Sequence, residues 1–320
     1  MNKMPETNAA LKDMNALITG VAGFLGRTLS RYLLQAGANV SGLDTGQSPE
    51  NLPEELEYYQ TNILDFDQLY NTLQKLRFKR PVVFHLAGEP NVGKSRTEPL
   101  SAWAVNVTGT AHLLEACRRA TIKQMVFPST ALVYARLTPP PYEETDPVQV
   151  SSVYSSTKLA SEALIKSYSV DFDFACRIAR LGNVYGPGGA PDSIVGIILR
   201  QVKNGGPITL KTLSSIRDFI YCDDVASGLA TLAVHATECG CETFNLSSGI
   251  PTSIRRLAEM ACEIGGIETD IIETEPQPGG AIDNLVTSIQ RIKEQTTWRP
   301  LWKLEDGLRK TLSEMELKTQ

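Results

Sequence analysis

The stretch Ala16-Leu-Ile-Thr-Gly20-Val-Ala-Gly23-Phe-Leu-Gly26 places three glycines at three-residue spacing between an apolar run and an amphipathic pattern. Gly20 permits a tight turn, Gly23 lets the backbone approach a pyrophosphate without a Cβ in the way, and Gly26 lets a helix and a strand pack closely. The N-terminus of the following helix offers free N–H groups and a positive dipole to phosphates. The stretch therefore predicts a strand–turn–helix unit that binds a dinucleotide.

Asp44 indicates which dinucleotide is bound. It ends the next apolar run, Asn39–Leu43, at a position where a carboxylate can accept hydrogen bonds from an adenosine ribose. A 2′-phosphate would be repelled by Asp44, and the residues that follow, Thr-Gly-Gln-Ser-Pro, include no Arg to compensate. We therefore predict NAD rather than NADP as the cofactor.

From residue 15 onward, short apolar runs alternate with helical patterns, as in a parallel sheet covered by helices. We predict an α/β fold: a Rossmann doubly wound parallel sheet with a smaller, discontinuous C-terminal substrate-binding domain, because Gly- and Pro-rich loops follow Arg180. The predicted strands are Ala16–Thr19, Asn39–Leu43, Tyr58–Gln60, Val82–Leu86, Gln124–Pro128, Phe174–Arg180 and Thr243–Leu246. The predicted helices are Phe24–Ala36, Asp67–Leu76, Ser101–Ala120, Val153–Tyr168 and Val225–Ala236. We assign 14–181 and 216–247 to the NAD-binding domain, 182–215 and 248–314 to the substrate-binding domain, and 1–13 to a flexible lead.

Composition excludes several classes of function. The chain has 320 residues, 42% of them hydrophobic, and a formal charge of -5 without a long Lys/Arg run, which argues against nucleic-acid binding. The six cysteines include no CxxC pair, so we predict reduced thiols and no metal site. We find neither a signal-peptide pattern nor a long apolar run, and we predict a cytoplasmic protein that is not bound to a membrane.

Tyr154-Ser-Ser-Thr-Lys158 places a tyrosine and a lysine four residues apart, on one face of a helix. The pair follows a predicted strand that ends in Ser129 and Thr130. The hydroxyls of these two residues are expected at the carboxyl edge of the sheet, where open α/β folds bind their ligands. This combination predicts an active site at that edge.

These motifs together resemble the extended short-chain dehydrogenase/reductases of the NAD-dependent epimerase/dehydratase group, over about residues 14–314. The motifs that carry the resemblance are TGVAGFLG (19–26), NIL-D (62–65), HLAG (85–88), NVTGT (106–110), PSTALVY (128–134), YSSTK (154–158), RLGNVYGP (180–187) and RDFIYCDDVA (217–226).

The resemblance implies a role for each site residue. Tyr154 would be the general acid/base at a sugar hydroxyl or ketone, Thr130 would hydrogen-bond the same oxygen, and Lys158 would hold the nicotinamide ribose and lower the pKa of the tyrosine. Implied cofactor contacts are Gly20, Gly23, Phe24, Leu25, Gly26, Asp44, Asn62, Ile63, Leu86, Ala87, Gly88, Asn106, Ser129, Tyr154 and Lys158. Implied substrate contacts are Ser95, Thr130, Asn183 and Arg217. Relatives usually carry Asp at position 62, and Arg217 could instead pair with Asp218. His85 is expected to be a structural or phosphate-edge residue rather than a catalytic base.

The residues after Thr130 narrow the reaction. Sugar 4,6-dehydratases carry Asp-Glu at the two positions where this chain has Ala131-Leu132. Related decarboxylases have Glu at the position of Leu132, and epimerase-reductases have Cys at the position of Ala131. None of these three reactions is therefore favoured. The pattern from His85 to Ser95 is most similar to UDP-galactose 4-epimerases. We therefore predict an NAD-dependent nucleotide-sugar epimerase, acting at C4 through a transient 4-keto sugar. A nucleotide-sugar 4-ketoreductase of deoxysugar synthesis and a non-catalytic NAD-sensing scaffold stay open, and the atypical segment 276–281 leaves the base and the sugar unnamed.

By resemblance to the family's four-helix interface, we also predict a homodimer built on Ser101–Ala120 and Val153–Tyr168. The sequence supports this with an apolar stripe on the first helix, at Ala104, Val107, Ala111 and Leu114, and with Leu159, Ala163 and Ile165 on the second.

Overall fold

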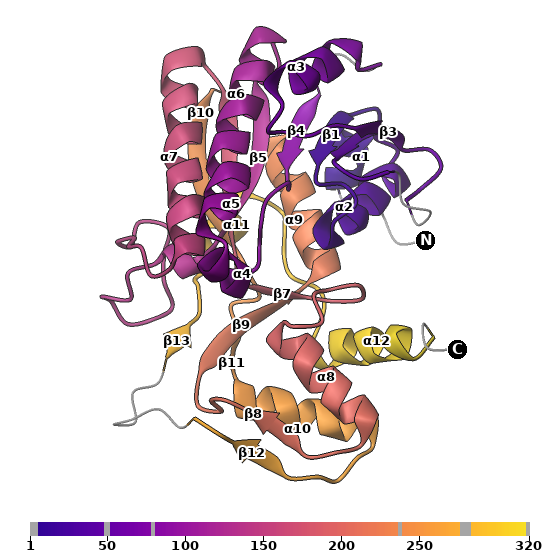
Figure 1. The fold of residues 1–320 in the computed structure, drawn as a ribbon, viewed down its shortest axis with the longest axis vertical. Coiled ribbons are helices and arrows are strands. Elements are labelled where there is room, and N and C mark those ends of the chain that lie inside the picture. The colour runs from indigo at the N-terminus through magenta and orange to yellow at the C-terminus, as the bar shows by residue number, and fades with distance from the viewer. Residues whose placement is uncertain (1–5, 48–51, 78–80, 236–238, 276–282, 318–320) are drawn as a thin grey trace.

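A computed structural model describes residues 6–47, 52–77, 81–235, 239–275 and 283–317. A large part built on one sheet stands above a smaller part, and the chain passes between the two more than once (Figure 1). The predicted α/β class is confirmed.

The large part is organised around a seven-stranded sheet in which every neighbouring pair is parallel. Its spatial order is β10-β6-β5-β4-β1-β2-β3, so the strand order reverses between β1 and β4. Open α/β sheets bind ligands at such a reversal, outside the carboxyl ends of the strands. The strands are β1 (Asn15–Thr19), β2 (Asn39–Asp44), β3 (Glu57–Gln60), β4 (Val82–His85), β5 (Gln124–Thr130), β6 (Ala175–Leu181) and β10 (Gly240–Leu246).

Helices cover both faces of this sheet. On one face α2 (Phe24–Gln35) and α9 (Cys222–His235) enclose a core that includes Leu29 and Leu229, both fully buried. On the other face lie α3 (Phe66–Lys75), α6 (Gly109–Arg119) and α7 (Val153–Phe172). Burial on both faces explains why strands such as β4 are apolar almost throughout.

The N-terminal lead contains a helix. Within the expected flexible segment 1–13, residues Glu6–Leu11 form helix α1, which packs against α9. Leu11 is fully buried in the same core as α2. The burial of Leu11 therefore anchors the end of the lead on the Rossmann domain. The polar composition of the segment gave no sign of this contact.

The predicted helix Ser101–Ala120 is divided into three segments: α5 (Pro99–Trp103), a π-helical turn (Ala104–Thr108) and α6. The short helix α4 (Val92–Thr97) precedes them. A π turn inserts a residue into the helical ladder and often occurs at functional sites. Here it contains Asn106, whose side chain is buried.

The small part has its own sheets and helices. Strand β9 (Ile216–Tyr221) pairs with β7 (Asn183–Tyr185), β11 (Pro251–Ser253) and β13 (Asn284–Leu285), and β8 (Ile208–Leu210) pairs with β12 (Ile271–Glu273). Its helices are α8 (Ile194–Asn204), α10 (Ile254–Gly265) and α12 (Leu304–Leu317). Two further short helices are η2 (Ala131–Val133), directly after β5, and α11 (Gln290–Gln295). The predicted return to the NAD-binding domain at residue 216 is therefore too early, because β9 belongs to the small sheet and the return begins with α9.

Candidate active site

A cavity of about 760 Å³ lies at the carboxyl ends of the parallel strands, where the two parts of the molecule meet. It brings together most of the residues that the sequence indicated. Those that line it are Gly20, Gly23, Phe24, Leu25, Gly26, Asp44, Asn62, Ile63, Leu86, Ala87, Gly88, Ser129, Thr130, Tyr154 and Lys158. The small part contributes Val184, Ala190 and Ser193 to the wall.

The glycine turn leaves no room for side chains. Gly20 has a φ of +71°, and a Cβ on it would lie 2.7 Å from the amide nitrogen of Ala87. A Cβ on Gly26 would lie 2.2 Å from the carbonyl oxygen of Gly20. Gly23 is the N-cap of α2, and no side chain caps this helix end, so its first N–H groups can receive a phosphate. The turn thus fits the pyrophosphate of a dinucleotide.

Asp44 is held at the end of β2 by two backbone amides. One carboxylate oxygen accepts a hydrogen bond from Ala22 N at 2.9 Å and the other from Thr45 N at 2.8 Å. Each oxygen keeps a lone pair for a ribose hydroxyl, since a carboxylate accepts about four hydrogen bonds. Asn62 also lines the cavity, with its side-chain oxygen accepting from Leu64 N at 2.9 Å. These groups fit the adenosine end of NAD.

Helix α7 carries the tyrosine and the lysine into the cavity. The helix begins with a capping box in which Ser152 and Ser155 bond reciprocally to each other's backbone, and this places Tyr154 in the first turn. Tyr154 is buried and hydrogen-bonds Thr130 at the end of β5. Lys158, one turn further along, donates from Nζ to the carbonyl oxygen of Pro128 at 2.8 Å.

Burial sets the protonation of this pair. It raises the pKa of Tyr154 to about 12, and the hydrogen bond from Thr130 offsets this only in part. It also lowers the pKa of Lys158 to about 8, against a smaller opposing effect of Glu162. The lowering of the tyrosine pKa by Lys158 that the family resemblance implies stays a prediction.

Glu162 supports the site from behind, and the sequence analysis missed it. Its buried carboxylate accepts from Ser129 Oγ at 2.5 Å and forms an ion pair with Arg180 at 2.9 Å. Because Ser129 precedes Thr130 and Glu162 follows Lys158 by one helical turn, this carboxylate fixes β5 and α7 relative to each other. The available signal was its i+4 spacing from Lys158 on the same helix face.

His85 is structural, as expected. It is buried, with Nδ1 2.8 Å from Thr19 Oγ1 and Nε2 2.9 Å from Thr110 Oγ1. Burial lowers the pKa of its imidazole to about 3, and the positive charge of Lys158 lowers it further. The ring is therefore neutral, and it joins β1 to α6.

Four expected site residues do not line the cavity. Asn106 lies behind its wall and Asn183 lies on β7, half-buried. Ser95 is fully buried and donates back to the carbonyl oxygen of Asn91 at 2.8 Å. Arg217 forms an ion pair with Asp283 rather than with its neighbour Asp218. The atypical segment 276–281 lies outside the described residues.

Comparison with known proteins agrees with this geometry. A model of the NAD dependent epimerase/dehydratase family matches residues 16–247. The chain belongs to this family. A relative in it, the UDP-glucose 4-epimerase of Mycolicibacterium smegmatis, is 33% identical over 96% of this chain and 100% of its own. The UDP-glucuronate 4-epimerase of Thermodesulfobacterium geofontis is 29% identical over 93% of this chain and 94% of its own.

A solved structure of a family member, the UDP-glucose 4-epimerase of Thermus thermophilus in complex with NAD, superimposes with a TM-score of 0.84. It is 27% identical and covers 95% of this chain and 99% of its own. The predictions of an enzyme, of NAD as its cofactor and of a nucleotide-sugar epimerase family are confirmed. In the described part of the chain, no helix is both long and apolar enough to cross a membrane.

Proposed function

We propose that this chain is an NAD-dependent 4-epimerase of a UDP-sugar. The observation that carries the proposal is the set of ionisable side chains among the described residues that line the cavity: Asp44, His85, Tyr154 and Lys158. Asp44 lies at the adenosine end, and His85 is locked between two threonines. Among these described lining residues, Tyr154 with Lys158 is thus the one acid/base unit, which suits redox at a ring carbon.

Elimination of water would need an additional acid and base. The two positions after Thr130 are occupied by Ala131, which is buried, and Leu132, which is half-buried. Their apolar side chains cannot transfer a proton. This supports epimerisation over dehydration, in agreement with the names of the relatives above.

The chain's own residues would divide the work as follows. Thr130 orients the sugar hydroxyl toward Tyr154, and Tyr154 removes its proton as the carbon is oxidised and returns a proton as the ketone is reduced. Lys158 would bind the nicotinamide ribose, while Asp44 and the N-terminus of α2 hold the rest of NAD. Bound NAD supplies the acceptor and donor of hydride.

The test is incubation of the purified protein with UDP-glucose and with UDP-galactose, followed by NMR of the sugar and by absorbance of NADH. An epimerase converts each sugar into the other without net change in NADH. A ketoreductase would instead leave both sugars unchanged and would consume one NADH per keto sugar once a keto sugar is supplied. A scaffold protein would bind NAD without turnover. The Tyr154→Phe variant serves as the inactive control.

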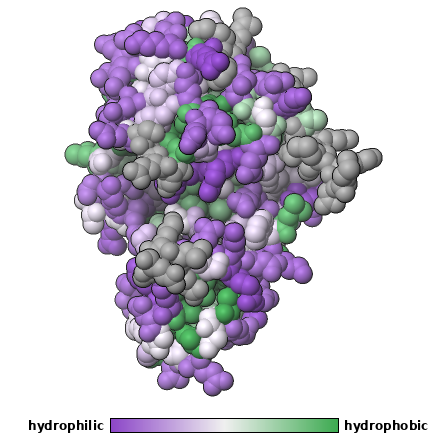
Figure 2. Space-filling model, turned by 90° about the vertical axis from the view of Figure 1, so that its right-hand side faces the viewer, coloured by the Kyte–Doolittle hydropathy of each residue, from purple (hydrophilic) through white to green (hydrophobic). Residues whose placement is uncertain are grey.

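We also propose that the enzyme is a cytoplasmic homodimer whose interface is formed by α5, the π turn, α6 and α7. Leu114 and Ile165 of the expected stripe are fully buried in the sheet core, so they do not contribute. Leu100 and Val170 are 84% and 80% exposed, and Trp103 is 40% exposed. The face turned away from α7 is mostly hydrophilic, with small separate hydrophobic areas (Figure 2).

Exposed apolar side chains on the helical face favour burial against a second copy. Sedimentation equilibrium should therefore give twice the chain mass of 35.0 kDa. Replacement of the exposed Ala163 on α7 by Glu should return the mass to that of one chain. A monomeric native protein would contradict the proposal.

A further inference from the structure

We propose that Glu89 makes this site selective for sugars without a carboxylate, so that UDP-sugars with a neutral ring are substrates and UDP-uronates are rejected. The inference rests on the proposed function and deepens it. The family relatives described above include both a UDP-glucose and a UDP-glucuronate 4-epimerase, so the family alone does not decide between the two.

Glu89 lies in a loop that is fixed at the wall of the cavity. It follows Gly88 and precedes Pro90, and both neighbours line the cavity. The side chain of Asn106 holds the main chain of Glu89 on both sides: it accepts from the amide nitrogen at 2.7 Å and donates to the carbonyl oxygen at 3.2 Å. Asn106 is itself fixed by a 2.9 Å hydrogen bond to Thr157 on α7. The main chain of Glu89 is therefore held in place relative to α7.

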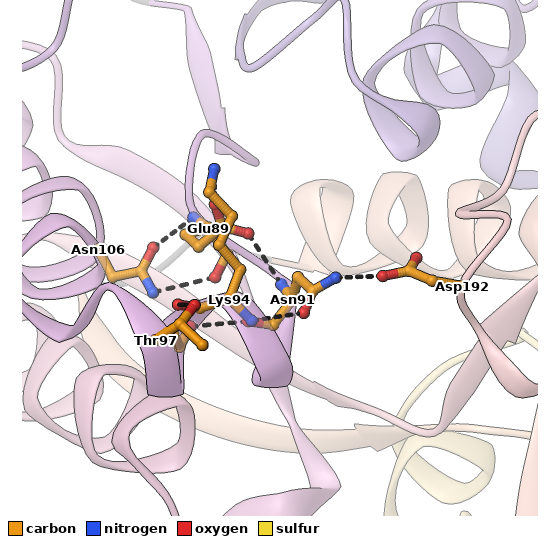
Figure 3. A network of polar contacts seen from close by, with 7 residues as sticks. Glu89, Asn91, Lys94, Thr97, Asn106 and Asp192 are labelled. Carbon is orange, nitrogen blue, oxygen red and sulfur yellow. Dashed lines mark hydrogen bonds and ion pairs between the residues drawn. The ribbon is translucent and has the colours of Figure 1, made fainter.

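The charge of Glu89 is only partly neutralised. One carboxylate oxygen accepts from Asn91 N at 3.0 Å, and the other forms an ion pair with Lys94 at 2.7 Å (Figure 3). The Glu89 side chain is 15% exposed, whereas that of Lys94 is 51% exposed. Solvent screens the lysine more than the carboxylate. The negative charge of Glu89 also contributes to the raised pKa of Tyr154, so its field reaches the reacting hydroxyl.

A second carboxylate lies at the same rim. The side-chain amide of Asn91 donates to Asp192, which connects the Glu89 loop to the small part of the molecule (Figure 3). Asp192 stands between Pro191 and Ser193, and Ser193 and Ala190 line the cavity. Acidic side chains thus adjoin cavity-lining residues in both parts of the molecule.

The described lining of the cavity offers an acidic sugar no unpaired cation. Among the described residues that line the cavity, Lys158 is the only one with a cationic side chain, and it donates to Pro128. Like charges that approach each other in a partly buried site repel strongly enough to reduce binding by roughly 10- to 100-fold. A C6 carboxylate would add such a charge, whereas a hydroxymethyl group would not.

The test compares UDP-glucose with UDP-glucuronate in two measurements. One is kcat/KM of the NAD-loaded enzyme, and the other is the calorimetric Kd of each ligand for NAD-loaded Tyr154→Phe, which does not depend on turnover. We expect UDP-glucose to be preferred by at least about 10-fold in both. Glu89→Gln, which keeps an oxygen for Asn91 N–H, should lower this preference about 10-fold. Lys94→Gln, which unmasks the carboxylate, should increase it.

Glu98→Gln is the matched control, since it removes a charge from an exposed residue of the same region and should leave the preference unchanged. Equal binding of the two ligands, or a preference that responds to neither Glu89→Gln nor Lys94→Gln, would overturn the inference. Absence of turnover with the binding preference intact would refute the proposed function alone.

Discussion

Replacement of Lys158 by Met should stabilise the fold near neutral pH while it abolishes activity. Burial lowers the pKa of Lys158 to about 8 from its ordinary 10.5, even though its ammonium group donates to Pro128 and lies 4.4 Å from the centre of the Phe127 ring. At 1.36 kcal/mol per pKa unit, the charged side chain costs the folded state about 3 kcal/mol. Loss of the hydrogen bond to Pro128 costs the variant about 1 kcal/mol of stability. The net gain expected for Lys158→Met is about 2 kcal/mol at pH 7.

The stability difference between Lys158→Met and the native protein should depend on pH. Below pH 8 the lysine is protonated in both states, so the native protein carries the full cost of the buried charge. Between pH 8 and 10.5 the unfolded chain binds more protons than the folded one, and the stability of the native protein rises with pH. The advantage of Lys158→Met should therefore be constant below pH 8 and shrink by about 3 kcal/mol toward pH 10.5.

The assay is urea unfolding of both proteins at pH 7, 9 and 10.5, after removal of NAD, because a ligand bound to the folded state would mask the difference. Lys75→Met is the control at an exposed lysine and should give no pH-dependent difference. A Lys158→Met protein that is less stable at pH 7, or a gap that does not change with pH, would refute the reasoning.

Three further changes test the site. Gly26→Ala places a Cβ 2.2 Å from the carbonyl oxygen of Gly20; it should reduce the free energy of unfolding by about 1–3 kcal/mol and weaken NAD binding, which urea unfolding and calorimetry measure. Tyr154→Phe should keep the NAD affinity and lower kcat about 100-fold or more in the NMR assay, and an active variant would disprove its role. Asp44→Ala should weaken NAD binding and reduce the protein's preference for NAD over NADP. Unchanged calorimetric affinities for the two dinucleotides would contradict the assignment of Asp44 to the adenosine ribose.

The sequence by itself determined the parts of this protein that depend on local pattern. The spacing of Gly20, Gly23 and Gly26 requires a turn that only glycine permits, and the alternation of apolar runs and helical patterns predicts the parallel sheet. Asp44 is identified by its place at the end of a predicted strand. The Tyr154–Lys158 pair is identified by its four-residue spacing, which puts both side chains on one helix face. Such features are fixed by neighbours within a few residues, so they can be read without coordinates.

Contacts between distant segments were decided only by the tertiary structure. Asn91 bonds Asp192 101 residues away, and Arg217 pairs with Asp283 rather than with its neighbour in sequence. Ser95, expected at the substrate, is turned into the core by the packing of its helix. The protonation of Lys158 depends on what surrounds it once the chain is folded. Periodicity says which face of an element is apolar, but it does not say which distant charge or carbonyl that element will meet.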